Sequence, residues 1–140
     1  MDDTVPTEPE RFGEMLAASK DVFVPVYHQR AQEAVRCYGA HAYLACLTMC
    51  GAAAEAIVLS IAQKLDLEYK NSYRIDALIK KIIDKSDKIK LEEINQFTSL
   101  LKYWRDEGMH GELERFQENE AFTSMALLLR FSIFAKENWF

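Results

Sequence analysis

The stretch AYLACLTMCGAAAEAIVLSIA, residues 42–62, decides how the rest of the chain is organised. It contains one charged residue, Glu55, and its apolar residues keep the spacing of a helix face. Its length would suit a membrane span, but it is rich in Ala, Gly and Cys rather than Leu, and inserting an ionised Glu55 would cost on the order of 3 kcal/mol. We therefore predict a central helix that neighbouring helices cover on most sides. The spaced apolar positions are Tyr43, Leu47, Cys50, Ala54, Ile57 and Ile61.

Glu55 is the exception in this helix, and two interpretations of it are open. A carboxylate on a mostly buried helix must be paired, hydrogen-bonded or protonated, because an isolated buried charge is costly. The alternative is that Glu55 occupies the one edge of the helix that faces water.

The segments around the central helix also carry helical patterns. Pro25 suits a first helical turn, and the apolar stripe after it runs to Gly39, which ends or bends the helix. Residues 75–83 show the clearest amphipathic pattern, and residues 91–104 also repeat apolar side chains every three or four positions. Asn119 is a good cap for the last helix. The stripes are Tyr27, Ala31, Ala34 and Tyr38; Ile75, Leu78, Ile79, Ile82 and Ile83; and, in the last helix, Phe122, Met125, Leu129 and Ile133.

No segment alternates with the period of a strand, so the predicted fold class is all-α. The simplest architecture is a bundle of four long helices plus a short N-terminal helix from Arg11 to Ala18. At 140 residues and 49% hydrophobic composition, the chain is the length of one domain, which we place at residues 11–140. Residues 1–10 carry four acidic groups and two prolines, and we expect a flexible acidic arm there.

The charge pattern limits how nucleic acid could bind. A net charge of −5 creates no overall field that attracts RNA or an anionic membrane, so any such contact needs a local patch. The one basic patch follows residue 79, and a solvated helix face explains it without a partner. Its candidate RNA contacts are Lys80, Lys81, Lys85 and Lys88.

The cysteines point to a reducing compartment. Cys37, Cys46 and Cys50 have no CxxC spacing and lie in apolar helical sequence, as buried reduced thiols do. A metal cluster with His41 is the alternative, but ligands strung along one helix cannot converge on a tetrahedral ion. We expect no metal, no cofactor and no membrane association, with His28 and His41 at surface or helix-end positions. The acidic N-terminus has no export signal pattern, so we predict a cytoplasmic protein.

A candidate functional site lies in the stretch YWRDEGMHG, residues 103–111, where an apolar helix face ends. Arg105 offers a planar fork of donors that binds phosphate oxygens bidentately. His110 titrates near neutrality and can take or give a proton, so the pair fits chemistry at a phosphodiester. The same Arg-x4-His spacing occurs at Arg36 and His41, and context must decide between the two.

The first of these segments resembles the Arg-[Asn/Asp/His]-x3-His ribonuclease motif of HEPN domains, a superfamily of small helical bundles. Arg105-Asp106 has the polar second residue of that motif, whereas Arg36-Cys37 does not. The branch that the chain resembles often has Gly-Asn before its histidine. Here the stretch reads Glu107-Gly108-Met109, which leaves the hydrogen-bonding role of the Asn unfilled.

The order of elements over residues 22–138 is similar to the prokaryotic HEPN branch often found beside restriction and defence genes. In that branch a helix with a Glu-Ala pair, here Glu33-Ala34, precedes a long Ala-rich helix that bears a Glu, here Glu55. An isoleucine-rich helix, the Arg…His segment and a closing apolar helix follow in the same order.

The resemblance implies a metal-independent endoribonuclease, a toxin or defence effector, that leaves a 2′,3′-cyclic phosphate. His110 would act on the 2′-hydroxyl and the leaving oxygen, Arg105 would hold the scissile phosphate, and Asp106 and Glu55 would orient them. In-line transfer needs a base and an acid, and each chain offers one suitable histidine, so a symmetric homodimer would compose the site. RNA and an antitoxin or defence-system protein are the implied partners.

Two other interpretations compete with catalysis. The domain could be a non-catalytic HEPN-like module that dimerises, docks a partner protein, or binds a nucleotide or RNA without cutting it. Alternatively, Arg105 pairs with Glu55 inside the bundle and His110 caps a helix carboxyl end. Asp106 and Glu107 also place negative charge beside the proposed phosphate, which weakens RNA affinity unless they point away.

Overall fold

The computed structural model describes residues 9–68, 75–86 and 118–140, and every regular element in these ranges is an α-helix. The all-α class is therefore confirmed for this part of the chain. The predicted helix over residues 91–104 lies outside it. The helices are α1 (Pro9–Ala17), α2 (Pro25–Gly39), α3 (Tyr43–Lys64), α4 (Ile75–Lys85) and α6 (Glu118–Trp139).

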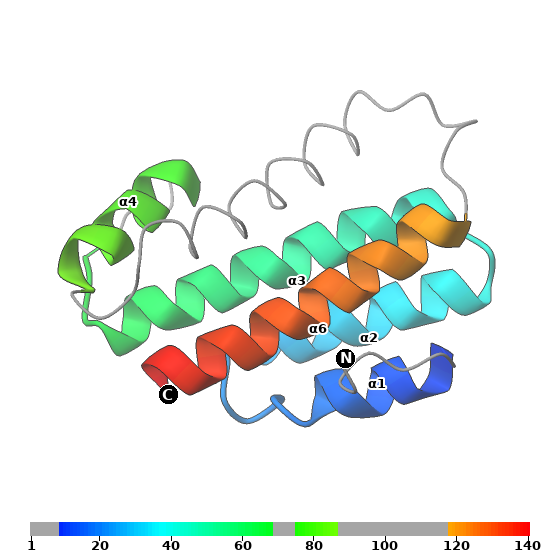
Figure 1. Cartoon of the computed structure of the whole chain (residues 1–140), viewed down its shortest axis with the longest axis horizontal. Helices are drawn as coiled ribbons and strands as arrows, with labels where there is room; N and C mark the ends of the chain where they lie inside the picture. Colours follow the sequence, from blue (N-terminus) through cyan, green and yellow to red (C-terminus); the bar gives the residue numbers. More distant parts are fainter. Residues whose placement is uncertain (1–8, 69–74, 87–117) are drawn as a thin grey trace.

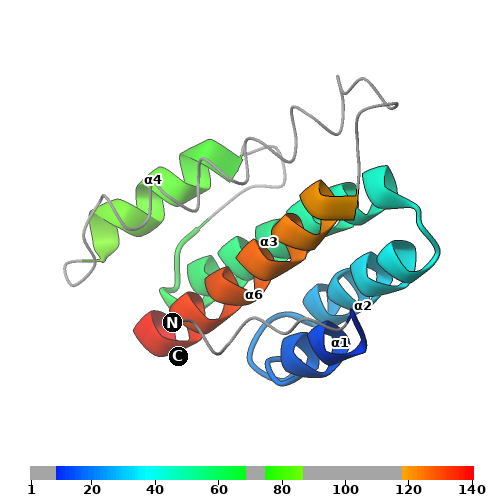
Figure 2. The ribbon, with the colours of Figure 1, turned by 45° about the vertical axis from the view of Figure 1, so that its right-hand side comes forward.

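Three long helices form the centre of the molecule. α2, α3 and α6 run side by side along its long axis, α1 lies along α2, and α4 lies near the carboxyl end of α3 (Figure 1). In the turned view, α4 and α1 lie on opposite sides of the α3–α6 pair (Figure 2). The α2–α3 turn and the start of α6 therefore share one end of the bundle, and α4 lies at the other.

The central helix α3 has the burial that its sequence predicts. Five of the six spaced apolar positions in residues 42–62 are buried, and only Tyr43, in the first turn, is half-buried. α3 is long and apolar enough to pass a length-and-composition test for a membrane span, and 56% of its most apolar window is buried inside the structure. The residues that bury it come from α2, α4 and α6, as expected for a central helix.

The start of α2 is held by residues far away in sequence. Val24 precedes α2 and gives it no side-chain cap, although Pro25 suits the first turn. Instead, the Val24 N–H donates to Ser60 Oγ on α3 (2.9 Å), and Ser60 Oγ donates to the Ala56 carbonyl (2.8 Å). The buried Tyr27 hydroxyl donates to the Leu16 carbonyl of α1 (3.0 Å). The predicted stripe of α2 is buried in full.

Two helix starts differ from the prediction. α1 includes Pro9 and Glu10, which lie inside the segment predicted as an arm, and proline suits the first turn of a helix because it needs no N–H partner there. α6 begins at Glu118, so Asn119 lies within the helix rather than at its cap, and its Oδ1 accepts the Glu120 N–H (3.0 Å). Glu118 and Glu120 lie in the first turn of α6, where the positive end of the helix dipole favours acidic residues.

The buried face of α6 is also shifted from the predicted stripe. Met125 and Leu129 are buried as predicted, but Phe122 and Ile133 are only half-buried and flank the core. Small residues occupy much of the true contact face, because they let the helix approach the Ala-rich α3 closely. The buried residues are Ala121, Ser124, Met125, Leu128, Leu129, Phe131, Ser132 and Ala135.

Candidate functional site

The predicted catalytic pair, Arg105 and His110, lies outside the described residues, together with Asp106 and Lys88. Their roles stay predictions. The structure places the other predicted site residues, which are Glu55 on α3 and Lys80, Lys81 and Lys85 on α4.

Glu55 lies on the least buried edge of α3. It is half-buried, and positions 45, 48, 52, 59 and 63 along the same edge are all exposed or half-buried. The Glu55 side chain makes no hydrogen bond or ion pair with any residue in the described part of the chain. Among the described residues, Glu55 therefore lies at the edge of α3 that faces water, which is the second of the two interpretations. A pairing with Arg105 stays a prediction.

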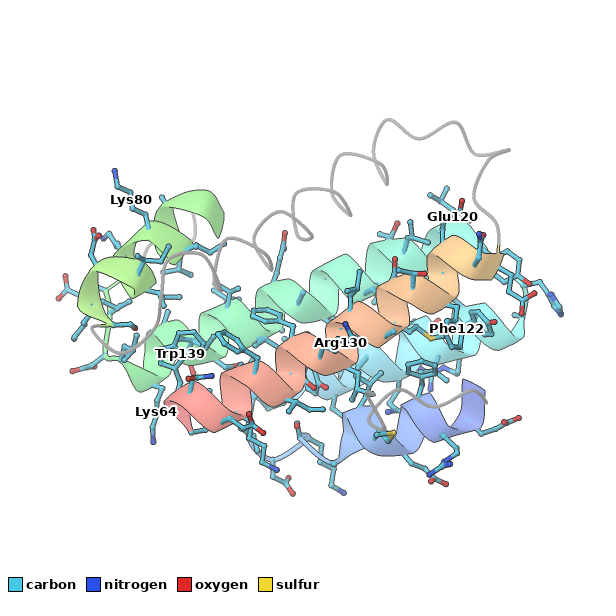
Figure 3. All side chains as sticks on the ribbon, in the orientation of Figure 1. Lys64, Lys80, Glu120, Phe122, Arg130 and Trp139 are labelled. Atoms are coloured by element: carbon cyan, nitrogen blue, oxygen red, sulfur yellow. The ribbon has the colours of Figure 1, made fainter. Side chains whose placement is uncertain are left out.

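Two lysines of the basic patch bind backbone at the carboxyl end of α3. Lys85 Nζ donates to the Leu65 carbonyl (2.5 Å), and Lys81 Nζ donates to the Glu68 carbonyl (3.4 Å). These carbonyls follow the last turn of α3, where the helix dipole favours a cation. Lys80 is exposed and points away from the bundle (Figure 3). Lys81 and Lys85 thus have a structural role at the end of α3. Among the described lysines of the basic patch, Lys80 is the one best placed to bind an anion.

The Glu-Ala pair of α2 is divided between core and surface. Ala34 is fully buried, whereas Glu33 is half-buried and pairs with Arg36 one helical turn later (Oε2 to Nη2, 2.5 Å). The Arg36 side chain is 68% exposed, so this pair contributes little to stability. Glu33 also accepts a weak hydrogen bond from Cys37 Sγ (3.9 Å).

A connected group of aromatic side chains surrounds the α2–α3 turn. His41 has a left-handed backbone (φ 61°), and its Nδ1 lies 2.8 Å from the Tyr43 hydroxyl. The Tyr43 ring lies against Tyr38, with centroids 5.8 Å apart. The Tyr38 hydroxyl donates to Glu118 Oε1 at the start of α6 (2.7 Å). Burial, with this hydrogen bond to Glu118, raises the pKa of Tyr38 to about 12.

His41 was expected at a surface or helix end, and it is exposed in the turn that follows α2. Its partnership with Tyr43 was not predicted from the sequence. The only sign in the sequence was a His-x-Tyr spacing two residues after a glycine at a helix end.

The three cysteines are free thiols, as predicted. Cys46 and Cys50 are fully buried on α3, and Cys37 on α2 is half-buried. Burial raises the pKa of the Cys37 thiol, and a hydrogen bond that Cys50 donates to Cys46, together with burial, raises that of Cys50. Raised pKa values keep the thiols protonated and weakly nucleophilic. Within the described ranges, no group of three His, Cys, Asp or Glu side chains is arranged to hold a metal ion.

Comparison with known proteins found no family model, no curated protein and no solved structure that matches the chain.

Proposed function

We propose that the chain is a HEPN-like, metal-independent endoribonuclease of the cytoplasm that acts as a homodimer, in the role of a toxin or defence effector. The observation that carries the proposal is the Arg105-Asp106-x3-His110 segment in a chain whose described part is a bundle of α-helices. Two further features support it. The Glu-Ala pair lies on α2 and Glu55 lies on the long Ala-rich α3, in the order of the HEPN branch that the sequence resembles.

The proposed reaction is an in-line transfer at phosphorus. A base removes the proton of the ribose 2′-hydroxyl, whose oxygen attacks the adjacent phosphorus, and an acid protonates the 5′-oxygen as the P–O bond breaks. The products are a 2′,3′-cyclic phosphate and a 5′-hydroxyl. His110 of one protomer serves as the base and its copy in the partner as the acid, while Arg105 neutralises the charge on the phosphate oxygens.

Glu55 and the lysines have supporting roles in this proposal. The Glu55 carboxylate is bound to no other described side chain, so orienting Arg105 would displace none of these contacts. Lys80, which is exposed, offers the phosphate backbone a cation, with Lys81 and Lys85 beside it. The salt dependence of RNA affinity should follow the number of phosphates that these lysines and Arg105 contact, and not the net charge of −5.

The test is cleavage of a mixed single-stranded and structured RNA by the purified chain in EDTA. His110→Ala and Arg105→Ala should each lower the rate by about a hundredfold or more, the contribution expected of a proton-transfer or transition-state group. Arg36→Ala is the matched control, because Arg36 has the same x4 spacing to a histidine but is paired with Glu33 on the surface. It should cleave at the wild-type rate and leave the same cyclic phosphate ends.

The outcomes separate the ribonuclease from its rival. No cleavage by the wild-type chain, or equal cleavage by wild type and both site variants, rejects the catalytic assignment and favours a docking module. The dimer has its own test, since a composite site loses specific activity on dilution below the dimer dissociation constant. Specific activity that stays constant while light scattering shows a monomer would reject the composite site.

A further inference from the structure

The α2–α3 turn carries a histidine at a backbone position that favours glycine. His41 has a φ of 61°, a conformation that glycine adopts freely and that costs other L-residues free energy. Gly39, two residues earlier, lies in α2 at a negative φ, and a Cβ built on it would meet no atom within 4 Å. The chain thus has glycine where other residues would fit and histidine where glycine would fit best.

The imidazole of His41 is exposed and held in place. Tyr43 fixes one edge of the ring through the 2.8 Å contact between its hydroxyl and Nδ1, and the two rings meet at 70° with centroids 5.8 Å apart. Tyr43 rests in turn on Tyr38, which is buried and tied to Glu118 of α6. The exposed His41 ring and the half-buried Tyr43 ring therefore lie together at this end of the bundle, on side chains from α2, α3 and α6.

The charges near this turn do not attract a phosphate, so stacking is the interaction that would hold a strand here. Arg36, the nearest arginine in the sequence, is already paired with Glu33, and Glu118 is exposed. The described lysines of α4 lie at the opposite end of the bundle, where Figure 3 labels Lys80, whereas Glu120 and Phe122 mark this end. A base can stack on these rings while its phosphates lie away from the carboxylates, and a nucleobase stacks on aromatic rings whatever its sequence.

We infer that His41 and Tyr43 form a stacking site for an unpaired base of single-stranded RNA. The inference rests on the proposed function for the identity of the polymer, and it names a contact separate from Arg105 and His110. Base stacking of this kind is sequence-tolerant, so the site holds the strand without selecting a sequence.

The experiment measures binding without cleavage. The probe is a fluorescein-labelled single-stranded oligonucleotide with 2′-O-methyl sugars, which removes the 2′-hydroxyl nucleophile, and the readout is anisotropy. His41→Gly and His41→Asn both suit a left-handed backbone and remove the aromatic ring, so each should keep the fold. Asp66→Gly is the matched control, because Asp66 is the other described non-glycine residue with a positive φ (57°) and follows α3 at the far end.

The expected result is a dissociation constant about tenfold higher for both His41 variants and unchanged for Asp66→Gly, as the loss of one stacked base predicts. An abasic strand of the same length should bind wild type and His41→Gly equally. In wild-type protein, the uncharged nucleoside adenosine should shift the His41 imidazole proton resonances through its ring current. Equal binding of the base-containing strand by wild type and both His41 variants overturns the inference.

The result also separates this site from the ribonuclease proposal. His41-dependent binding by a chain that cleaves no RNA leaves the stacking site in place and rejects catalysis. If cleavage needs His110 but binding does not change in the His41 variants, catalysis is supported and the stacking site is rejected. If wild type binds no strand, the stacking site is rejected.

Discussion

Ser60 joins the start of α2 to the middle of α3, and replacing it should measure how much this connection stabilises the bundle. Its hydroxyl accepts the Val24 N–H (2.9 Å), donates to the Ala56 carbonyl (2.8 Å), and belongs to a side chain that is only 4% exposed. Val24 precedes α2 and has no side-chain cap, so in Ser60→Ala its N–H loses the hydroxyl that serves as its acceptor.

The expected cost follows from opposing effects. An orphaned N–H in a partly buried position costs about 1–3 kcal/mol, and alanine returns about 0.5 kcal/mol through its higher helix propensity. The free energy of unfolding should therefore fall by about 0.5–2.5 kcal/mol, which lowers the melting temperature of a domain of this size by about 2–10 °C.

The assay is urea unfolding followed by far-UV circular dichroism, with an unchanged slope and a lower midpoint expected for Ser60→Ala. Thr48→Ala is the control, because the Thr48 hydroxyl makes the same kind of bond to a carbonyl four residues back (Leu44, 3.1 Å) but is exposed. It should stay within about 0.5 kcal/mol of wild type. Coincident midpoints for the two variants, with no faster hydrogen exchange at the Val24 amide, would refute the reasoning.

Two other predictions concern the bundle itself. Burial and the hydrogen bond to Glu118 raise the pKa of Tyr38 from 10.0 to about 12. As the pH rises, the Tyr38 hydroxyl therefore loses its proton in the unfolded chain before it does so in the folded one. The contribution of this shift to the free energy of unfolding should be full below about pH 10 and fall between about pH 10 and 12. Urea midpoints across this range should fall less steeply for Tyr38→Phe, and an identical slope would contradict the assignment. Ala54→Leu places a large side chain at a fully buried contact of α3 and should cost about 1–3 kcal/mol, whereas Ala45→Leu, on the exposed edge, should stay within about 0.5 kcal/mol. Equal thermal midpoints for these two variants would show that α3 is not packed as described.

The candidate site could be predicted only in part. The Arg-x4-His spacing indicates which residue types could act on a phosphodiester, but it does not say where their side chains lie in space. It also occurs twice in the chain. The occurrence at Arg36 and His41 lies in the described residues, where Arg36 pairs with Glu33 and His41 meets Tyr43. The basic patch was visible as a run of lysines, but its bonds to the end of α3 were not.

The helices and their apolar faces were determined by the sequence, because a period of three to four residues decides locally which side of a helix is apolar. The buried stripes of α2 and α3 followed directly from that period. For α6 the period was not enough, since the small residues that face α3 carry little hydrophobic pattern.

Tertiary structure alone decided which distant polar groups meet. Val24 and Ser60 are 36 residues apart, Leu65 and Lys85 are 20 apart, and Tyr38 and Glu118 are 80 apart. The physical reason is that a hydrogen bond depends on distance and direction in space, which helix packing sets, and no local pattern records either one.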